Sequence, residues 1–424
     1  MCRLLIALYG DSTGTWGHSD SFPYARLDSA LAAMPSAFST DSISVRLADV
    51  TIAWNVLRHF YPYSDIVTVN WDSALTATLH EAVGDTDEID FVFTLRRMTE
   101  LLKDGHAGAW TAAMGAYQPP PFWTDWIEGY LVVTAAPETT GLKPGDVIVS
   151  LDSVPSEEYV RSREEFISGS PQWKRVVSAV MRAGSGRAGT VLNLEVRRRD
   201  STFRLALRRT PSRPTLNAGL AEIRELKPGI WYVDLRRAEM SEIDKKMKIL
   251  ARARGVVFDL RGYPVDNFDV IPHLLTVPDT SRTWQQIPVF VYPDLESIAG
   301  WDVSGWSLKP QQPHIAGRTV FLTDAKAMSG AEWFMGFIES YHLAEIVGEP
   351  SAGANGIFNP LTLPAGVNVT FAGMRALKHD GSPHHLVGVL PTVPVTRTIK
   401  AVREGRDEYL EKALEIIEGP GRMK

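Results

Sequence analysis

The sequence predicts a multidomain α+β protein with a helical N-terminal domain, a small β-rich module and a C-terminal α/β core. Its 424 residues exceed what one hydrophobic core usually organises. Apolar residues first recur at helical spacing, short β-rich runs follow, and strands then alternate with helices. A composition of 44% hydrophobic and 22% charged residues is typical of a globular protein.

The helical domain is expected at residues 45–116, after an N-terminal extension of residues 1–44. The stretches RLADVTIAWNVLRHF and FVFTLRRMTELLKDGH carry apolar residues three and four positions apart. Between them, WDSALTATLHEAV restarts a helix, and Asp72 in its first turn suits the helix dipole. We therefore expect a small helical domain that ends in the histidine of KDGH, His106.

The β-rich module is expected at residues 117–212. Three consecutive prolines, Pro119 to Pro121, cannot continue a helix and indicate a boundary. The runs that follow are rich in β-forming residues and are separated by turn residues such as KPGD. These runs are GYLVVTAAP, DVIVSLDSV, TVLNLEVRRRD and TFRLALRRT.

The α/β core is expected at residues 213–424, where strand-like and helix-like stretches alternate. The stretches are IWYVDL, SEIDKKMKILARA, GVVFDLRG, TVFLTDA and SGAEWFMGFIES. This alternation predicts a largely parallel sheet, and active sites in such sheets lie at the carboxyl ends of the strands. Ser329 falls between the strand TVFLTD and the helix that begins at SGAEW.

Charge, cysteine content and hydropathy exclude several classes of protein. A net charge of -6 gives no reason to expect nucleic acid as a partner. The single cysteine, Cys2, excludes an internal disulfide framework and a cysteine-rich zinc site. The start, MCRLLIALYG, is not a clear signal peptide, and no run approaches the roughly 18 apolar residues of a membrane span.

Ser329 is the residue most clearly marked for chemistry. A serine nucleophile needs a base for its proton and backbone donors for the developing oxyanion. The first turn of a helix offers free N–H groups, so Gly330 N–H is a natural oxyanion donor. The alternative is that Ser329 is only a helix N-cap, with Glu332 three residues later completing a capping box.

A second strand end, FDLRGYP, could bring further donors. Gly262 allows close backbone approach, and its N–H is the expected second oxyanion donor. Asp259 and Arg261 are expected to hold the turn through ion pairs or hydrogen bonds.

Taken in order, these motifs resemble the carboxyl-terminal processing peptidase and tricorn clan of serine peptidases. The resemblance covers most of residues 45–418 and rests on RLADVTIAWNVLRHFYPY, LLKDGH, GLKPGDVIVSLDSVP, FDLRGYP, TDAKAMSGAEW, IVGEPSAG and GVLPTVPV. It implies a PDZ-like module at residues 117–212 and a ClpP/crotonase-like catalytic core at residues 213–424. It also implies that Ser329 is the nucleophile of a serine peptidase, either an endopeptidase or a carboxyl-terminal processing-like enzyme.

The resemblance implies two ways to activate the serine. The processing peptidases use a lysine in a segment like GEPSAGK, but this chain reads GEPSAGANG, with Ala354 at that position. The tricorn-like branch uses a histidine from the end of the helical domain, and His106 matches it. Histidine titrates near neutral pH, so His106 is the expected general base. From local residues alone, it could instead cap a helix end.

The group that orients His106 departs from the family pattern. The tricorn-like branch has a serine before the histidine, where this chain has Gly105. It also has a glutamate before the G-V-x-P motif, where this chain has His384 and His385. Those two histidines are not expected to bind a metal, because adjacent residues in a strand point to opposite faces.

Three acidic residues remain as candidates for the orienting acid. They are Glu332, Asp104 and Asp380, and Glu332 ranks first.

The resemblance also suggests how a substrate is held. Residues Gly129, Tyr130 and Leu131 resemble the loop with which a PDZ module binds a peptide by strand addition, although an ordinary strand after a tight turn fits them nearly as well. The expected partner is a peptide or an unfolded protein, and no metal or organic cofactor is implied. A homo-oligomer and a bacterial periplasmic or secreted location are compatible with the resemblance. Two alternatives remain, a serine esterase of the same fold and a non-catalytic relative that binds an apolar ligand or a peptide.

Overall fold

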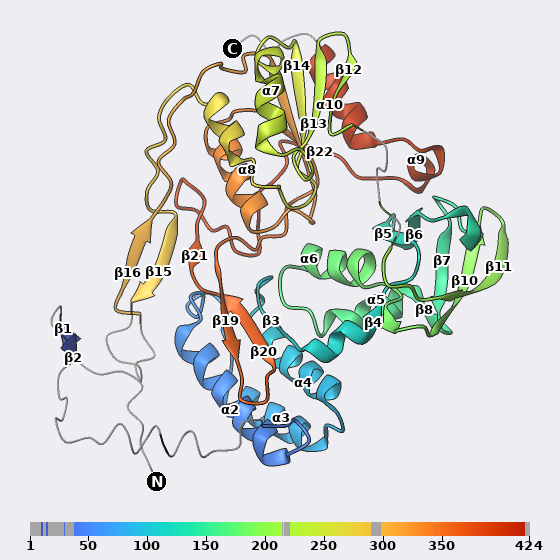
Figure 1. Cartoon of the computed structure of the whole chain (residues 1–424), viewed down its shortest axis with the longest axis vertical. Helices are drawn as coiled ribbons and strands as arrows, with labels where there is room; N and C mark the ends of the chain where they lie inside the picture. Colours follow the sequence, from blue (N-terminus) through green and yellow to red (C-terminus); the bar gives the residue numbers. More distant parts are fainter. Residues whose placement is uncertain are drawn as a thin grey trace.

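The computed structural model describes residues 10–11, 14–15, 29, 38–213, 215, 221–289 and 298–419. Cys2 lies outside the described residues, as does most of the expected extension. The architecture is α+β and multidomain, as predicted, with several separate sheets. Figure 1 shows the helices of the N-terminal part at one end, the α/β part at the other, and a β-rich module beside them.

Three helices form the N-terminal layer: α2 (Ile43–Phe60), α3 (Trp71–Gly84) and α4 (Glu88–Glu100). Side chains cap two of them, because Asn70 accepts a hydrogen bond from Ser73 N–H and Asp87 accepts from the first turn of α4. In the described part of the chain, no helix is long and apolar enough to cross a membrane.

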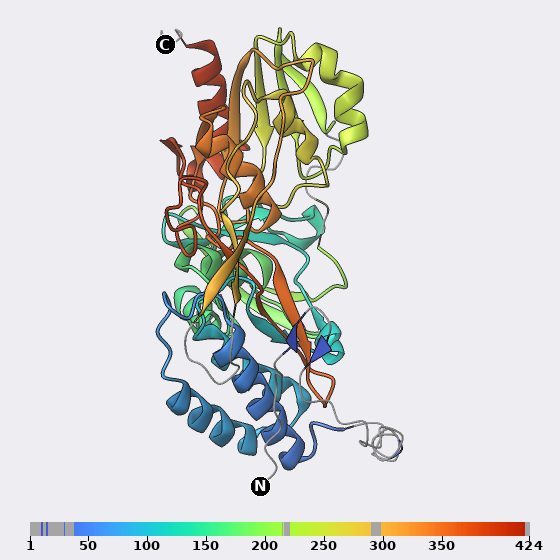
Figure 2. The same cartoon turned by 90° about the vertical axis from the view of Figure 1, so that its left-hand side faces the viewer.

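A hairpin from far along the chain completes this layer. It consists of β19 (Phe358–Thr362) and β20 (Asn368–Ala372), and β20 pairs antiparallel with β3 (Gly108–Trp110). Side chains of the hairpin enter the core between the helices, among them Val369 and Phe371. Figure 2 shows the hairpin running down beside the helices. The helical layer therefore draws on residues well beyond 45–116.

The β-rich module is a sheet in the order β11-β10-β7-β6-β5, with β8 paired to β7. Its strands are β5 (Trp123–Ile127), β6 (Tyr130–Ala135), β7 (Val147–Leu151), β8 (Val154–Pro155), β10 (Val191–Arg198) and β11 (Ser201–Arg208). Its helical segments are η2 (Glu138–Thr140), α5 (Ser156–Glu164), α6 (Pro171–Arg175) and the π-helical η3 (Val176–Met181).

The C-terminal part contains the predicted, largely parallel sheet, in the order β12-β13-β14-β17-β18-β22. Its strands are β12 (Ile223–Lys227), β13 (Ile230–Asp234), β14 (Gly255–Asp259), β17 (Arg318–Thr323), β18 (Glu345–Gly348) and β22 (Val393–Pro394). Only the β12–β13 pair is antiparallel.

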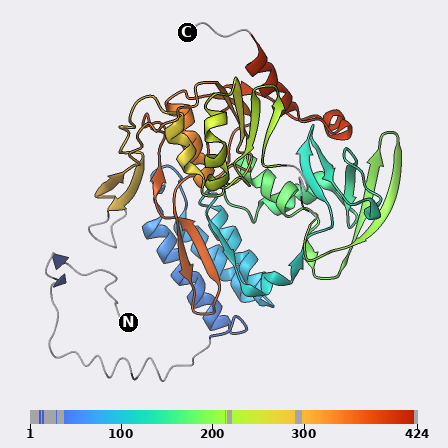
Figure 3. The same cartoon turned by 45° about the horizontal axis from the view of Figure 1, so that its top comes forward.

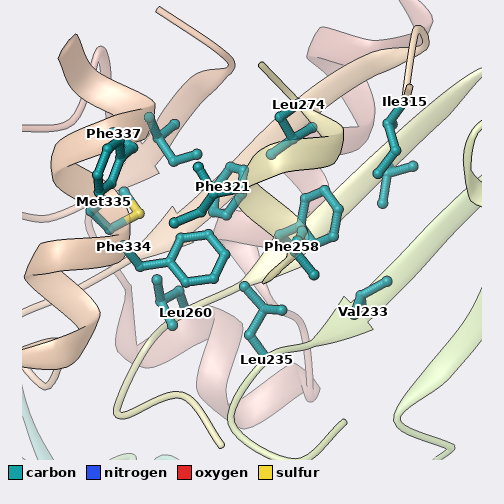
Figure 4. Packing of buried hydrophobic residues seen from close by; sticks show 14 of the residues in the cluster. Val233, Leu235, Phe258, Leu260, Leu274, Ile315, Phe321, Phe334, Met335 and Phe337 are labelled. Atoms are coloured by element: carbon teal, nitrogen blue, oxygen red, sulfur yellow. The ribbon is translucent and has the colours of Figure 1, made fainter. Parts of the chain in front are cut away.

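Helices cover both faces of this sheet, which explains why β14 is buried at every position. Side chains of α7 (Met240–Leu250) and α8 (Gly330–Ser340) pack on one face, where Phe258 and Phe321 meet Phe334 and Phe337 (Figure 4). Side chains of α10 (Glu408–Glu418) pack on the other face, against Val257. Figure 3 shows α7 and α8 side by side over the sheet.

The remaining elements are short. They are β1 (Gly10–Asp11), β2 (Gly14–Thr15), η1 (Ala112–Ala116), β4 (Tyr117–Gln118), β9 (Gly186–Arg187), η4 (Phe268–His273), β15 (Gln285–Val289), β16 (Gly300–Ser304), β21 (Arg375–Ala376) and α9 (Ile399–Glu404). Val402 of α9 packs on Ile127 and Val147 of the β-rich module, so the end of the chain ties the α/β part to that module.

Candidate active site

Ser329 lies at the carboxyl end of the sheet, between β17 and the first residue of α8. Its backbone has φ 52° and ψ -116°, a conformation that residues with a side chain rarely adopt. Among the described residues, its hydroxyl makes no capping hydrogen bond to α8. The hydroxyl donates instead to the carbonyl of Gly356 at 3.3 Å. The N-cap alternative is therefore not seen, and the strained backbone turns this hydroxyl away from the helix end.

Gly330 follows Ser329 at the first position of α8, where a helix N–H lacks an intrahelical acceptor. A Cβ at this position would lie 2.7 Å from the hydroxyl of Tyr263 and 3.3 Å from the ring of Phe268. A side chain here would displace the Tyr263 ring, and the FDLRGYP turn does meet the start of the α8 helix.

Gly262 in that turn is placed differently from the expectation. Its N–H already donates to the carbonyl of Leu260 at 3.0 Å, two residues back, as in a γ-turn. Its φ of 143° needs glycine. The group of this turn that reaches Gly330 is the hydroxyl of Tyr263, a residue that is 58% exposed.

The strand end before this turn has the expected structural role. Arg261 donates to both carboxylate oxygens of Asp259 and to both of Asp407, which begins α10. Burial raises the pKa of Asp259, but the charges of Arg261 and Arg236 outweigh it and hold that pKa far below its usual value. The pairs hold the turn rigid against the C-terminal helix.

His106 lies beyond the end of α4 and pairs with a carboxylate two residues earlier. Its Nδ1 is 3.6 Å from Oδ1 of Asp104, which is ion-pair distance and longer than a hydrogen bond. Both side chains are buried, and within the described chain neither ring nitrogen of His106 has a hydrogen-bond partner. The imidazole is thus held by packing, and neither of its ring nitrogens is engaged in a hydrogen bond.

Asp104 is fixed from several sides. It accepts hydrogen bonds from the N–H of His106 at 2.9 Å and the N–H of Ala372 at 2.7 Å, while its own N–H donates to Ser168. Burial raises its pKa, but the side chain of His106 and the charge of His385 lower it, and the net pKa is below the usual value. Asp104 therefore stays ionised beside His106.

Glu332, the first-ranked orienting acid, lies against another histidine. Its Oε2 is 3.3 Å from Nε2 of His384, and it accepts hydrogen bonds from Ser351 Oγ and the N–H groups of Gly353 and Ala354. Burial raises its pKa, but these partners together lower it below its usual value. The structure thus gives Glu332 the task of holding the GEPSAGANG loop, and the carboxylate beside His106 is Asp104.

Asp380, the third candidate acid, and His385, the residue after His384, both contact groups other than His106. Asp380 is exposed and accepts hydrogen bonds from the N–H and hydroxyl of Ser382. His385 stacks on Tyr63 with ring centroids 3.9 Å apart, and burial lowers its pKa to about 4. In the part of the chain that the structure describes, no group of three side chains could hold a metal ion.

The GEPSAGANG loop links Ser329 to His106. The carbonyl of Ala354 accepts a hydrogen bond from Ser329 N–H at 2.8 Å, and a Cβ at Gly105 would lie 2.5 Å from the Cβ of Ala354. Phe358, two residues after Gly356, stacks on His106 with centroids 6.4 Å apart. Ser329 and the histidine segment therefore contact the same five-residue stretch, 354–358.

The same contacts surround the position of the missing lysine. Ala354 is buried and faces Gly105 so closely that even a methyl group on residue 105 would collide with it. The side chain at position 354 is therefore closely packed against Gly105.

The β-rich module also reaches this loop through α6. Ser170 Oγ donates to the carbonyl of Ala352 at 2.6 Å, and Gln172 donates to the carbonyl of Ser351 at 3.2 Å. Trp173 packs on Ala352 and Ala354. The candidate site therefore forms where all three parts of the molecule meet, and Ser351 and Ser168 are supporting residues that local sequence did not single out.

The expected peptide-binding strand is paired on both sides at Leu131. Gly129 lies in the turn before β6, and Leu131 pairs with Trp126 on one side and Ile148 on the other. Leu131 is fully buried, and Tyr130 is half exposed. Leu131 of β6 therefore has a strand on each side, which leaves no open edge for a peptide at this residue. The sequence showed a strand but not its position in the sheet.

His106 opens on a cavity of about 310 Å³, which Thr370 and Trp173 also line. A second cavity of about 890 Å³ shares five lining residues with it and lies between the helical layer and the β-rich module. Space for a ligand therefore adjoins the histidine side of the candidate site.

Comparisons with known proteins find a family model that matches part of the chain. Residues 281–395, which include Ser329, match the profile of Peptidase family S41. A search of curated proteins finds no match.

Solved structures share the fold across nearly the whole chain. Mature CPAF complexed with lactacystin is 12% identical, with a TM-score of 0.71 over 89% of this chain and 98% of that chain. Mature CPAF is likewise 12% identical, with a TM-score of 0.71 over 90% and 99% of the two chains. A putative peptidase from Parabacteroides merdae ATCC 43184 is 14% identical, with a TM-score of 0.55 over 88% and 98%.

At such identities the likeness to solved structures shows the fold, and the profile match carries the family. The profile match and the shared fold together confirm the resemblance, which was based on the sequence motifs. The segment that holds Ser329 matches the model of Peptidase family S41, in agreement with the clan of serine peptidases that the ordered motifs resemble.

Proposed function

We propose that this protein is a serine peptidase that cleaves peptide bonds through an acyl-enzyme on Ser329, with His106 as general base. One observation carries the proposal. The strained, uncapped Ser329 and the buried His106–Asp104 pair contact the same stretch, residues 354–358. A nucleophile and an ionised acid beside an imidazole, held against one stretch of chain, are the parts that acyl transfer requires.

In the proposed mechanism, the Ser329 side chain first rotates away from the carbonyl of Gly356. His106 then accepts the hydroxyl proton as Oγ attacks the substrate carbonyl, and it returns that proton to the leaving amine. Water repeats the sequence to release the acyl group. Asp104 replaces Glu332 as the residue that positions and charge-stabilises the imidazole.

The oxyanion that forms during each attack needs donors near Ser329 Oγ. We propose Gly330 N–H as the first donor. Because Gly262 N–H is engaged, the hydroxyl of Tyr263 is proposed as the second donor, supported by its closeness to Gly330.

The finer architecture belongs to the same proposal. We infer that residues 117–212 form a PDZ-like domain and residues 213–424 a ClpP/crotonase-like core. The five-stranded path of the module and the parallel β13–β14–β17–β18 ladder support these assignments. Substrate profiling with matched peptide and ester substrates separates a peptidase from a serine esterase, since both use one mechanism.

A non-catalytic binding protein is the second candidate. It is favoured by the Ser329 hydroxyl, which donates to Gly356 and not to an imidazole, and by the large cavity that shares a wall with the cavity of His106. Such a protein would bind ligand without turnover.

Labelling with a fluorophosphonate probe tests the proposal, since the probe reacts only with an activated serine. We expect rapid labelling of the wild type, none of Ser329→Ala, and strongly slowed labelling of His106→Ala. Ser340→Ala, at the exposed far end of α8, is the matched control and should label normally. A wild type that stays unlabelled supports the binding protein, and a Ser329→Ala variant that still labels overturns the assignment.

A further inference from the structure

The cavity that His106 lines and the larger cavity next to it share a wall that contains two arginines. Five residues line both: Arg96, Trp110, Phe166, Ile167 and Arg182. The larger cavity adds the guanidinium groups of Arg163 and Arg213. In contrast, the described lining of both cavities contains no aspartate or glutamate.

None of these four arginines forms an ion pair with a carboxylate of the described chain. Arg96 is 7% exposed, and its Nε donates to the carbonyl of Ala109 at 2.8 Å. Arg213 donates to the carbonyl of Val180 and lies over the ring of Trp123 at 4.5 Å. Their contacts are neutral carbonyls and aromatic rings, so their charges remain uncompensated.

An uncompensated buried cation is unfavourable, which is visible in the ionisation of these groups. Burial lowers the pKa of Arg96 to about 9, with a further contribution from the charge of Arg182, and burial lowers the pKa of Arg213 to about 10. With these pKa values, Arg96 and Arg213 still carry a positive charge at neutral pH. A ligand anion would relieve this repulsion, whereas a cation would increase it.

The rest of the wall is aromatic and apolar. Phe93, Tyr117, Trp123 and Tyr159 line the larger cavity, and Trp110, which is half exposed, lines both. Aromatic walls with a few charged groups select a ligand that has an apolar body and one polar end.

We propose that this cavity is the substrate-selecting site of the peptidase and that it takes a carboxylate next to a large apolar side chain. The inference rests on the proposed function for the identity of the ligand as a peptide. A carboxylate at Arg182 would lie on the wall that both cavities share, and the chain attached to it would extend toward His106. The carboxylate belongs either to an acidic side chain or to the end of a peptide, and these sources share the same chemistry.

The test measures peptide binding to the full-length Ser329→Ala protein, which cannot turn the peptide over. The probes are fluorescein-labelled decapeptides of glycine and serine around one Phe–Glu or one Phe–Gln pair, each with a free or an amidated carboxyl end. Fluorescence polarisation gives the dissociation constants. We expect a carboxylate to improve affinity about ten-fold or more, because charge-assisted hydrogen bonds form out of water. The Glu/Gln comparison reports an acidic side chain, and the free/amidated comparison reports a chain end.

Variants then locate the effect. Arg163→Gln and Arg182→Gln, both exposed to the cavity and without ion pairs in the described chain, should each remove most of the carboxylate preference and retain affinity for the neutral peptide. Arg252→Gln removes the same charge at the exposed end of α7, outside the cavity, and should retain the preference.

Equal affinity for all four peptides overturns the inference, and so does a preference that survives both cavity variants. The outcome is separable from that of fluorophosphonate labelling. If the protein prefers a carboxylate but is never labelled, the carboxylate site is supported and the peptidase function is contradicted. If the protein is labelled but shows no preference, only the carboxylate site is contradicted.

Discussion

At the residue scale, the acid that serves His106 comes from its own turn. Asp104 lies two residues earlier, accepts two backbone hydrogen bonds and stays ionised through its neighbouring imidazoles. Glu332 is equally buried but is committed to His384 and the GEPSAGANG loop. Asp104 and Glu332 are both buried and hydrogen-bonded, but they face different histidines. Their expected roles differ for that reason.

Replacing each acid by its amide distinguishes those roles. Asp104→Asn should lower kcat/KM by roughly 100-fold or more, since the imidazole loses the charge that stabilises its protonated form. Glu332→Gln should chiefly lower stability, by about 2–4 kcal/mol, because a buried hydrogen-bonded charge is lost. Peptidase kinetics with thermal unfolding of both variants measures the two effects. The assignment would be reversed if Glu332→Gln lost activity while remaining fully stable and Asp104→Asn stayed active.

The second oxyanion donor makes a separate prediction. Tyr263→Phe removes only a hydroxyl from a largely exposed side chain, so stability should change by less than about 0.5 kcal/mol. If that hydroxyl stabilises the oxyanion, kcat should fall about 10- to 1000-fold at nearly constant KM. Steady-state kinetics checks this. An unchanged kcat would show that the Tyr263 hydroxyl is not the second oxyanion donor beside Gly330 N–H.

His385 makes stability depend on pH. Its pKa is lowered to about 4 in the folded protein, against about 6.5 when unfolded, so the unfolded chain binds more protons between these values. Stability should therefore fall as pH drops from 6.5 toward 4. Between pH 7 and 4.5 this group contributes about 2 kcal/mol of that loss.

The matching measurement is urea unfolding at both pH values. His385→Gln should shrink the difference in unfolding free energy by about 2 kcal/mol. An unaltered pH dependence would show that His385 is not held neutral.

At the scale of elements, the β19–β20 hairpin connects stability to the site. Phe371 of β20 is buried in the core of the helical layer, and the next residue donates its N–H to Asp104. Phe371→Ala should lower the free energy of unfolding by about 3–5 kcal/mol. It should also lower activity, since the support of Asp104 loosens.

Thr362→Ala, on an exposed end of the same hairpin, is the control and should change stability by less than about 0.5 kcal/mol. Chemical unfolding of both variants provides the comparison. A stable Phe371→Ala protein would mean that the hairpin does not support the helical layer.

Periodicity predicted the elements well because each one is a local property of the chain. The three helices and the parallel strands follow from apolar spacing, and the strand–Ser329–helix order follows from small residues after TVFLTD. The position of β6 inside its sheet could not be read locally, because β7, its partner on the side away from β5, pairs with residues more than a dozen positions earlier in the chain. The peptide site expected at Gly129 to Leu131 stays a prediction, and Leu131 already pairs on both sides.

At the scale of the whole molecule, the candidate site exists only because three parts meet. α6 of the β-rich module, Gly105 of the helical layer and α8 of the core all contact the GEPSAGANG loop. The ordered motifs indicated Ser329 and His106 far apart in the sequence. They could not indicate which acid faces which histidine, because each buried acid lies beside a different imidazole and only the tertiary packing sets these pairs.

The central claim is that Ser329 is a nucleophile activated by the His106–Asp104 pair. Peptide mapping by mass spectrometry of the fluorophosphonate-treated full-length protein tests it most directly. The account predicts one adduct, on the peptide that contains Ser329, whose rate of formation falls in both His106→Ala and Asp104→Asn. An adduct on any other residue, or one on Ser329 that forms equally fast in all three proteins, would contradict it.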